Sequence, residues 1–475
     1  MGRAYDRLDA RALLIDLYSS AVRAAAPGPA LEKALAFQPP VSTRPWIIAL
    51  GKAAHPMTAT AVRTLERVHL EPAGGVIVAP NEAGFNHPFS PSSTSPHPSI
   101  AIATGDHPEP GAGSLCASAR IGEVARPARS SKEVWVLLSG GATSLAASPI
   151  DGVPPADLTA LFSLLQRSGL DISAMNTVRK RFLRWGAGRL AAALAPARVR
   201  VFVVSDVIGD YMAAIGSGPC VPDENTAADV RRILADADLW QRTPETVRIE
   251  LARTERDSSL ETPKAGDECF RFVESAIIAN NQTALDGAAE RAAELGIQTV
   301  THTEPISGDA ASAGPFLVRT ILDHRRGGTL RVTHGAPSCL IAGGETVVKL
   351  QEMYGTSRNL GREPPSGGRC QELALSAARA LRTLIGENMA LLAAGTDGRD
   401  GPTDAAGAIV DDATWDRIES AGRTPDDDLA RHGSYRALDS VGALLRTGLT
   451  GTNVADIMIA SVWSKSRDEG VRGGE

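Results

Sequence analysis

The stretch VWVLLSGGATSL, residues 134–145, decides the fold, because a continuous apolar run ends in a glycine-rich polar turn. Short β-rich runs of the same kind, bounded by glycine, serine or aspartate, stand at residues 46–50 (WIIAL), 75–79 (GVIVA) and 199–204 (VRVFVV). Helical periodicity marks the intervals, at residues 53–68, 114–126, 156–168 and 173–194. Continuous apolar strands that alternate with helices predict a parallel sheet covered on both faces.

A similar alternation follows in the second half of the chain. Strands are predicted at residues 275–279, 297–302, 338–342 and 389–394, with helices at 282–295, 311–324 and 370–384. Because 475 residues exceed what one hydrophobic core usually supports, we expect two domains. The predicted fold class is α/β, with an amino-terminal Rossmann-like parallel sheet flanked by helices at residues 1–255 and a carboxy-terminal α/β domain at 270–462.

The remaining segments are assigned from their periodicity and composition. Residues 9–25 predict an opening amphipathic helix. The polar, charged stretch at 241–268 is the candidate linker between the domains. Residues 84–100 and 351–368 are rich in proline, serine and glycine and predict surface loops, and residues 464–475 predict a frayed end.

The composition is that of an ordinary globular protein, 43% hydrophobic and 22% charged, with 49 basic against 55 acidic residues. No run of one charge sign favours nucleic acid, and no apolar window of about 18 residues predicts a membrane span. The five cysteines lie far apart and predict reduced thiols instead of a disulfide framework. Because the first residues lack the layout of a secretion signal, we expect a cytoplasmic protein.

Polar, glycine-rich segments follow the predicted strands, at the carboxyl ends where open α/β sheets bind ligands. They supply backbone amides, one lysine and several carboxylates, which are the groups that phosphoryl transfer needs. The segments are residues 51–53, 105–108, 139–144, 205–210, 343–346 and 395–398.

Each candidate side chain also has an ordinary structural interpretation. Lys52 follows a glycine at a strand end and could meet a phosphate or carboxylate, but exposed lysine is common. Arg369 opens a predicted helix behind two glycines, where it could contact an anion or pair with Glu372. Asp206 and Asp397 stand in glycine-rich turns, where aspartate often serves as a turn former or cap. Residue type and spacing leave both interpretations open.

Several familiar motifs are missing from the sequence. There is no G-x-x-x-x-G-K-[ST], which excludes a P-loop kinase at the level of motifs. A G-x-G-x-x-A occurs at residues 186–191 (GAGRLA), but it continues a helical pattern, whereas a dinucleotide fingerprint follows a strand. No G-x-S-x-G elbow surrounds any serine, which weakens a serine-hydrolase interpretation.

Taken together, these segments resemble the class II glycerate 2-kinases, a family whose carboxy-terminal module is the MOFRL domain. The ordered set from about residue 45 to residue 457 makes the resemblance specific, since any one stretch alone is weak. The matching stretches include IIALGKAA (47–54), GDHPEP (105–110), VLLSGGATSL (136–145), NTVRK (176–180), VSDVIGD (204–210), IAGGETVV (341–348), GGRCQELAL (367–375), AAGTDGRDGPTDAAGAIVD (393–411) and TGLTGTNVADI (447–457).

The resemblance implies an enzyme that transfers the γ-phosphate of ATP to the 2-hydroxyl of D-glycerate, giving 2-phosphoglycerate and ADP, with Mg²⁺ as cofactor. Carried onto matching positions, Lys52 and Arg369 would be the catalytic cations on the phosphate side. Asp206 and Asp397 would be the catalytic carboxylates, acting as metal ligands or as the base. The neighbours expected to bind substrate or nucleotide are Ser139, Gly140, Gly141, Asn281 and Glu345.

The sequence departs from the family pattern beside these loops. Ala142 replaces a third glycine, Gly186 opens a stretch that replaces Lys–Gly–Gly, Tyr211 replaces a common second acid, and Cys370 replaces asparagine. A kinase of a related small hydroxy or sugar acid, a hydroxypyruvate reductase and a non-catalytic binding member are therefore alternatives. The expected partners are the small hydroxy acid and ATP, without nucleic acid or membrane, and a homodimer is one expected assembly.

Overall fold

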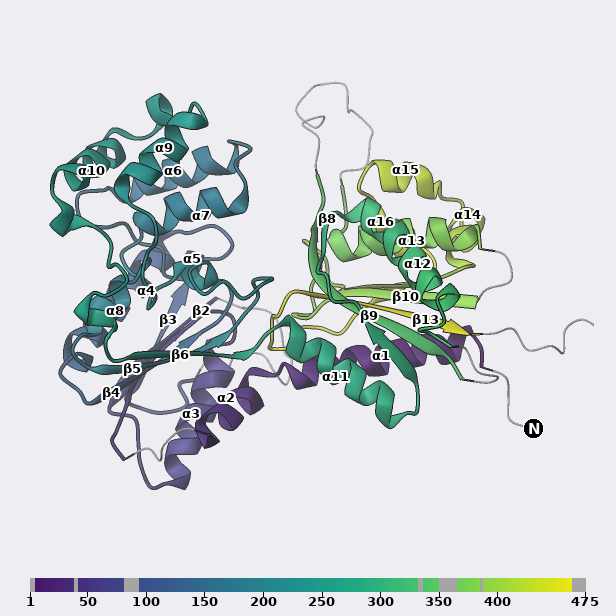
Figure 1. Cartoon of the computed structure of the whole chain (residues 1–475), viewed down its shortest axis with the longest axis horizontal. Helices are drawn as coiled ribbons and strands as arrows, with labels where there is room; N and C mark the ends of the chain where they lie inside the picture. Colours follow the sequence, from purple (N-terminus) through teal and green to yellow (C-terminus); the bar gives the residue numbers. More distant parts are fainter. Residues whose placement is uncertain are drawn as a thin grey trace, which may run out of the picture. The chain divides into compact units, whose positions relative to one another are not determined.

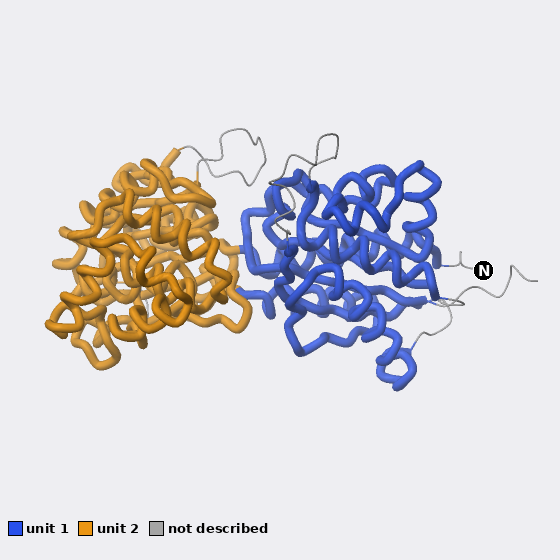
Figure 2. The backbone as a smooth tube through the Cα atoms, turned by 90° about the horizontal axis from the view of Figure 1, so that it is seen from above, with its two compact units in different colours: residues 1–26, 280–475 blue, residues 27–279 orange. Residues whose placement is uncertain are grey.

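The computed structural model describes residues 5–37, 42–80, 94–331, 336–349, 365–384 and 388–463. The chain divides into two compact units, drawn in orange and blue in Figure 2. Residues 27–279 form the parallel-sheet unit, and residues 1–26 together with 280–475 form the mixed-sheet unit. The predicted loops at 84–100 and 351–368 fall largely outside the described residues, and the predicted frayed end at 464–475 falls entirely outside them.

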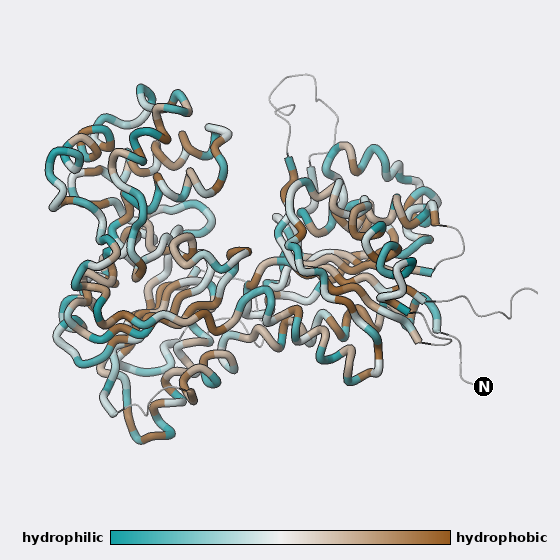
Figure 3. The backbone as a smooth tube through the Cα atoms, viewed as in Figure 1, coloured by the Kyte–Doolittle hydropathy of each residue, from teal (hydrophilic) through white to brown (hydrophobic). Residues whose placement is uncertain are grey.

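The parallel-sheet unit contains a six-stranded sheet in the order β3-β2-β1-β4-β5-β6, and every neighbouring pair in it is parallel. Its central strands are almost wholly buried, as continuous apolar runs require, and they appear brown in Figure 3. The predicted parallel sheet is thereby confirmed. The strands are β1 (Trp46–Leu50), β2 (Gly74–Pro80), β3 (Ile100–Gly105), β4 (Glu133–Leu138), β5 (Arg198–Val204) and β6 (Val273–Ala279).

Helices surround this sheet, and α6, α7, α9 and α10 gather in a group of their own with a separate core that includes Phe162, Phe182 and Val247 (Figure 1). The helix predicted at 173–194 is broken into α7 and α8, because Ala187 and Gly188 adopt left-handed backbone conformations between them. The α-helices are α2 (Pro27–Ala36), α3 (Ala54–Arg67), α4 (Ala112–Ala128), α5 (Ala142–Leu145), α6 (Pro155–Gln166), α7 (Ile172–Arg181), α8 (Arg189–Leu194), α9 (Ala227–Asp236) and α10 (Glu245–Arg256). Short 3₁₀ turns are η1 (Ile215–Ser217), η2 (Trp240–Arg242), η3 (Ser258–Leu260) and η4 (Glu268–Phe270).

The mixed-sheet unit contains a sheet in the order β12-β11-β10-β13-β9-β7, with β8 added beside β9. Strands β7 and β8 run parallel to β9, whereas the pairs from β9 through β13, β10 and β11 to β12 are antiparallel. The alternation seen in the sequence therefore continues as a mixed α/β sheet. The strands are β7 (Gln298–Thr301), β8 (Ile306–Asp309), β9 (Ser338–Val347), β10 (Asn388–Gly395), β11 (Gly407–Asp411), β12 (Leu444–Leu445) and β13 (Asp456–Trp463).

Two layers of helices cover this second sheet: α1 and α11 pack together on one face, and α12 and α13 pack together on the other (Figure 1). Figure 3 shows the apolar strands between these layers. The helices are α1 (Arg7–Ala24), α11 (Asn281–Glu294), α12 (Ala310–Arg326), α13 (Arg369–Arg382), α14 (Thr414–Ser420), α15 (Pro425–Ala430) and α16 (Ser434–Asp439).

The compact units differ from the predicted domains at both ends of the parallel-sheet unit. Helix α1 belongs to the mixed-sheet unit, where the buried Tyr18 hydroxyl donates to the carbonyl oxygen of Gly395 at 2.7 Å. The predicted linker at 241–268 is instead folded into the parallel-sheet unit, because α10 buries Val247 and Leu251 in its core. Strand β6 then completes the first sheet, so the chain leaves this unit at residue 279.

The thiol and membrane predictions can be compared with the described residues. All five cysteines are free. Within the described ranges, no helix combines the length and the apolar character that crossing a membrane requires.

Candidate active site

The order of the parallel sheet has a switch point between β1 and β4. Strands β2 and β3 continue to one side of β1, and β4, β5 and β6 continue to the other side. In open α/β sheets of this order, ligands bind at the carboxyl edge where the strand order reverses. Lys52 follows β1 and Ser139 follows β4, so both predicted residues stand at this switch point.

Backbone hydrogen bonds hold these two loops together. The N–H of Ser139 donates to the carbonyl oxygen of Leu50 at 2.9 Å, and the N–H of Lys52 donates to that of Gly140 at 3.0 Å. The Ser139 hydroxyl oxygen in turn accepts from the N–H of Ala53 at 2.9 Å. The two loops can approach this closely only because residue 51 is a glycine. Gly51 has a φ of 118°, and an added Cβ would overlap the Ser139 side chain.

Asp206 approaches the same loop from the next strand of the sheet. It follows β5, and a Cβ added to Gly140 would overlap its Oδ2 atom, so the carboxylate lies directly against the glycine Cα. Gly141 has a φ of 83°, and an added Cβ would lie 3.2 Å from the His107 ring and 3.6 Å from Cγ of Lys52. The loop therefore brings together all five residues predicted in this unit: Lys52, Ser139, Gly140, Gly141 and Asp206.

Arg369 is the centre of a second cluster, in the mixed-sheet unit. It is the first residue of α13, and its guanidinium donates to both carboxylate oxygens of Asp456, at 2.6 and 3.0 Å. A third donor reaches Oε1 of Glu345 at 2.6 Å. Burial alone would lower the pKa of Arg369, but the hydrogen bonds and charge of Asp456 and the charge of Glu345 overcome that effect and raise it. Arg369 is therefore a fixed, permanently charged fork.

The other predicted residues of this unit lie around the same acid. Asn281 donates from Nδ2 to the carbonyl oxygens of Val454 and Asp456, at 2.8 and 3.1 Å. A Cβ added to Gly395 would lie 3.3 Å from Oδ1 of Asp397 and 3.5 Å from Oδ1 of Asp456, so both carboxylates flank that glycine. The cluster thus contains Asn281, Glu345, Arg369 and Asp397, with Asp456 in the middle.

Asp456 belongs to this cluster, although the sequence analysis did not select it. Its carboxylate is only 2% exposed and is held against Arg369. The alternative pairing of Arg369 with Glu372 is wrong, because the buried Glu372 carboxylate instead contacts Nδ1 of His432 at 2.9 Å. The stretch 447–457 contains Asp456, but only the pairing of β13 with β9 and β10 shows which cation it meets.

A buried acid also caps the helix that carries Arg369. Asp400 accepts hydrogen bonds from the N–H groups of Cys370 and Gln371, at 3.1 and 2.8 Å. Burial raises the pKa of Asp400 to about 7, the charge of Asp456 adds to this, and the two N–H donors oppose it. Asp400 therefore has a capping role, which was one interpretation of aspartates in this glycine-rich turn.

The residues that depart from the family pattern lie in different surroundings. Cys370 is completely buried in the core of the mixed-sheet unit. Tyr211 is exposed and donates its hydroxyl to Glu224 at 2.9 Å. Ala142 packs against Gly216, where an added Cβ would lie 3.2 Å from its methyl group. Within the described part of the chain, no three acidic, histidine or cysteine side chains form a cluster that could hold a metal ion.

The sequence of this chain matches known protein families. Residues 13–252 match the domain of unknown function DUF4147, and residues 338–456 match the MOFRL family. A glycerate 2-kinase from Pyrococcus horikoshii is 35% identical over 420 residues, 88% of each chain. A relative from Agrobacterium vitis, provisionally named a hydroxypyruvate reductase, is 33% identical over 453 residues, 95% of this chain and 94% of its own.

A solved structure agrees with these sequence matches. The crystal structure of a glycerate kinase from Thermotoga maritima is 34% identical and superposes with a TM-score of 0.77, covering 94% of this chain and 98% of that chain. Both the similarity in sequence and the similarity in fold extend over nearly the full length. The chain therefore belongs to the glycerate 2-kinase family of DUF4147 and MOFRL proteins, which are kinases.

Proposed function

We propose that this protein is an ATP-dependent kinase that phosphorylates the 2-hydroxyl of D-glycerate, giving 2-phosphoglycerate and ADP. Membership of the family supports the use of ATP and a glycerate-like acceptor. The observation that supports the proposal most is the placement of Lys52 and Asp206 around the glycines of residues 139–141, at the switch point of the parallel sheet. A cation, a carboxylate and a bare backbone suit the approach of a phosphate and a hydroxyl.

In this proposal, the parallel-sheet unit orients the reacting groups. Gly140 and Gly141 let Asp206, His107 and Lys52 lie close to the backbone, since neither glycine carries a side chain into the loop. Lys52 would offset negative charge on a phosphate or on the carboxylate of the acid. Asp206 would orient the acceptor hydroxyl and take its proton, or would be the metal ligand on this side.

The mixed-sheet unit would supply a preorganised guanidinium. Because Asp456 and Glu345 already fix the fork of Arg369, little conformational entropy is lost when it meets a phosphoryl oxygen. Asp456 and Glu345 offset part of the positive charge of Arg369. Arg369 would therefore act through the orientation of its N–H donors as well as through its charge.

Carboxylates beside a proposed phosphate site suit a divalent cation. In kinase sites Mg²⁺ is usually held by one or two carboxylates together with substrate phosphates, so a dedicated protein cage is not required. We propose Asp206 in the parallel-sheet unit and Asp397 in the mixed-sheet unit as separate candidates for a protein ligand of Mg²⁺. When bound, Mg²⁺ would neutralise charge that develops on the phosphates.

Two alternatives remain distinct proposals. A kinase of a related hydroxy or sugar acid would use the same residues, and the departures at Ala142 and Tyr211 lie close enough to the loops to alter the choice of acid. A hydroxypyruvate reductase is disfavoured, because Gly188 immediately precedes α8, which follows another helix, whereas a dinucleotide fingerprint follows a strand. A homodimer and a cytoplasmic location stay predictions.

The proposal is tested by measuring ADP directly, by chromatography, with ATP, Mg²⁺ and a panel of hydroxy acids led by D-glycerate. A parallel assay follows NADH oxidation with hydroxypyruvate. ADP release that depends on D-glycerate and is abolished in Lys52→Ala supports the kinase. ADP release with another acid only would replace the substrate, and NADH oxidation without ADP release would overturn the proposal.

A further inference from the structure

A cavity of about 120 Å³ lies in the mixed-sheet unit, away from the Arg369 cluster. It opens beside Ala390 in β10, while Gly395 at the other end of that strand flanks Asp397. At about 3.3 Å per residue, the two points are roughly 17 Å apart along the strand. The volume is several times the ~10–15 Å³ that one water molecule requires, so a small molecule can enter.

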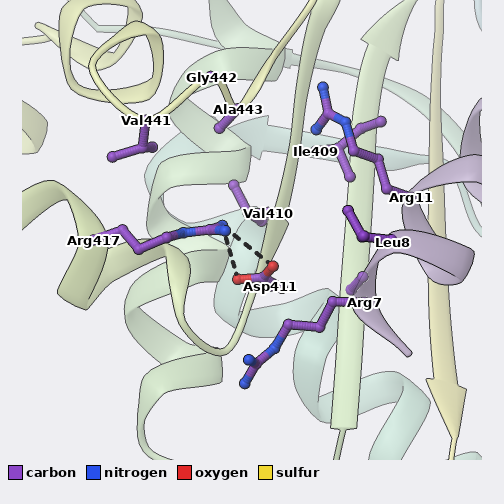
Figure 4. A pocket seen from close by; sticks show the side chains of 11 residues that line it. Arg7, Leu8, Arg11, Ile409, Val410, Asp411, Arg417, Val441, Gly442 and Ala443 are labelled. Carbon is purple, nitrogen blue, oxygen red and sulfur yellow. Dashed lines mark hydrogen bonds and ion pairs between the residues drawn. The ribbon is translucent and has the colours of Figure 1, made fainter. Parts of the chain in front are cut away.

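Three guanidinium groups line the cavity (Figure 4), and two of them are paired with acids. Arg7 donates from Nε and Nη2 to the two carboxylate oxygens of Asp412, each at 2.9 Å. Arg417 donates to both oxygens of Asp411, at 3.1 and 3.2 Å, and to the Thr414 hydroxyl at 2.9 Å. These bonds fix the two arginines on the rim and the wall of the cavity.

Arg11 is different, because no carboxylate among the described residues lies within ion-pairing distance of it. Its guanidinium donates at 3.3 Å to the carbonyl oxygen of Leu444, and its side chain is half-buried. Burial lowers the pKa of Arg11, and the nearby charge of Arg417 lowers it further, against a weaker opposing effect of Asp411. Two cations that repel each other across a cavity would both be stabilised by an anion between them.

Apart from the Asp411 carboxylate, which is bound by Arg417, the rest of the lining is apolar, which restricts the kind of anion. Leu8 is 72% exposed at the mouth, and Ile409 and Val441 form part of the wall. Such a surface suits a short hydrocarbon body, whereas the guanidinium forks match the paired oxygens of a phosphate or a carboxylate.

We infer that this cavity binds a small organic oxyanion, with its phosphate or carboxylate group between Arg11 and Arg417 and its apolar body against Leu8 and Ile409. The site is independent of the proposed kinase reaction, because none of its lining residues belongs to the Lys52 or Arg369 clusters. It would take an effector or a product-like acid, since its one lining carboxylate, Asp411, is already paired with Arg417.

The test measures binding of two probes, inorganic phosphate and butyrate, to the full chain by isothermal titration at constant ionic strength set with chloride. The variant Arg11→Met keeps the hydrocarbon stem but removes the charge. Arg319→Met, at an exposed arginine of α12 in the same unit, is the matched control. Arg369→Ala separates this cavity from the candidate active site.

The inference predicts saturable binding that weakens about tenfold or more in Arg11→Met, because charged hydrogen bonds are lost. Binding should be unchanged in Arg319→Met, and the Arg11-dependent component should persist in Arg369→Ala. Phosphate binding without butyrate binding would assign the site to phosphates, and the reverse would assign it to carboxylates. Equal affinities in Arg11→Met and Arg319→Met, or loss of all binding in Arg369→Ala, would overturn the inference. Binding of a protein segment without either probe would overturn it as well.

Discussion

The two units position their candidate catalytic cations in different ways. In the parallel-sheet unit, Lys52 is placed by backbone hydrogen bonds between loops and by glycines that admit neighbouring atoms. In the mixed-sheet unit, Arg369 is placed by two acidic side chains from β9 and β13. The first arrangement should therefore fail when a methyl group is added, and the second should fail when a charge is removed. The predictions below follow this difference, from the largest effect to the smallest.

The largest effect is expected from removing the cations themselves. Lys52→Ala and Arg369→Ala should each lower kcat/KM for the kinase reaction on the order of 10³-fold, because each would stabilise charge in the transition state. Their stabilities should differ. Arg369→Ala leaves the buried Asp456 carboxylate without its partner, which costs about 1–3 kcal/mol of unfolding free energy, whereas Lys52→Ala keeps the backbone hydrogen bonds of its loop and should cost less. Steady-state kinetics and denaturant titrations measure both, and equal stabilities would contradict the comparison.

Adding one methyl group should disable the backbone-built site. In Gly140→Ala the new Cβ would overlap the Asp206 carboxylate, so that side chain must move. A displacement of about 1 Å typically costs on the order of 10²-fold in rate. Gly209→Ala is the control, because its φ of 86° brings backbone strain although its added methyl group meets nothing within 4 Å. If both variants lose the same activity, contact with Asp206 is not the cause.

Removing one charge should weaken the side-chain-built site. Asp456→Asn keeps the shape but loses the buried ion pair with Arg369, so kcat/KM should fall about tenfold or more. Glu345→Gln, at the more exposed partner, should cost only a few-fold. A double variant of Asp456 and Arg369 should lose little more than Arg369→Ala alone, since the two act together. Additive losses would show that Asp456 acts separately.

The smallest effect on activity is expected at Asp400, which caps α13. There the measured quantity is the dependence of the unfolding free energy on pH. The pKa of Asp400 rises from about 3.9 in the unfolded chain to about 7 in the fold. The folded protein then binds the extra proton between these values, so this contribution to stability is present at low pH and is lost as pH rises towards 7. The unfolding free energy of wild type relative to Asp400→Asn should fall by up to about 1.4 kcal/mol per pH unit in that window. A flat difference would contradict this account of Asp400.

How far the sequence could predict the molecule also differs between the units. Strands β1, β4 and β5 are predicted to within about a residue, because buried parallel strands are continuous apolar runs bounded by glycine or serine. The loops that follow such strands meet at one edge of the sheet, so Lys52, Ser139 and Asp206 could be grouped without coordinates.

The mixed sheet could not be anticipated in the same way. Strand β13 pairs antiparallel with both β9 and β10, which lie far from it in the sequence, and periodicity carries no information about that register. No local sequence pattern therefore indicates that Arg369 pairs with Asp456. Spacing along the helix indicates only Glu372, three residues further on, as a partner. The sequence also does not predict that α1 belongs to the mixed-sheet unit, because its contacts there are with residues far away in the sequence.

The most direct test of the central claim is the identity of the phosphorylated product. Purified protein would be incubated with ATP, Mg²⁺ and D-glycerate, and the mixture followed by ³¹P NMR with authentic 2-phosphoglycerate and 3-phosphoglycerate added as standards. The account predicts a single new phosphomonoester signal that coincides with 2-phosphoglycerate and is absent in Lys52→Ala. A signal at 3-phosphoglycerate, or ATP consumption without any phosphorylated acid, would contradict it.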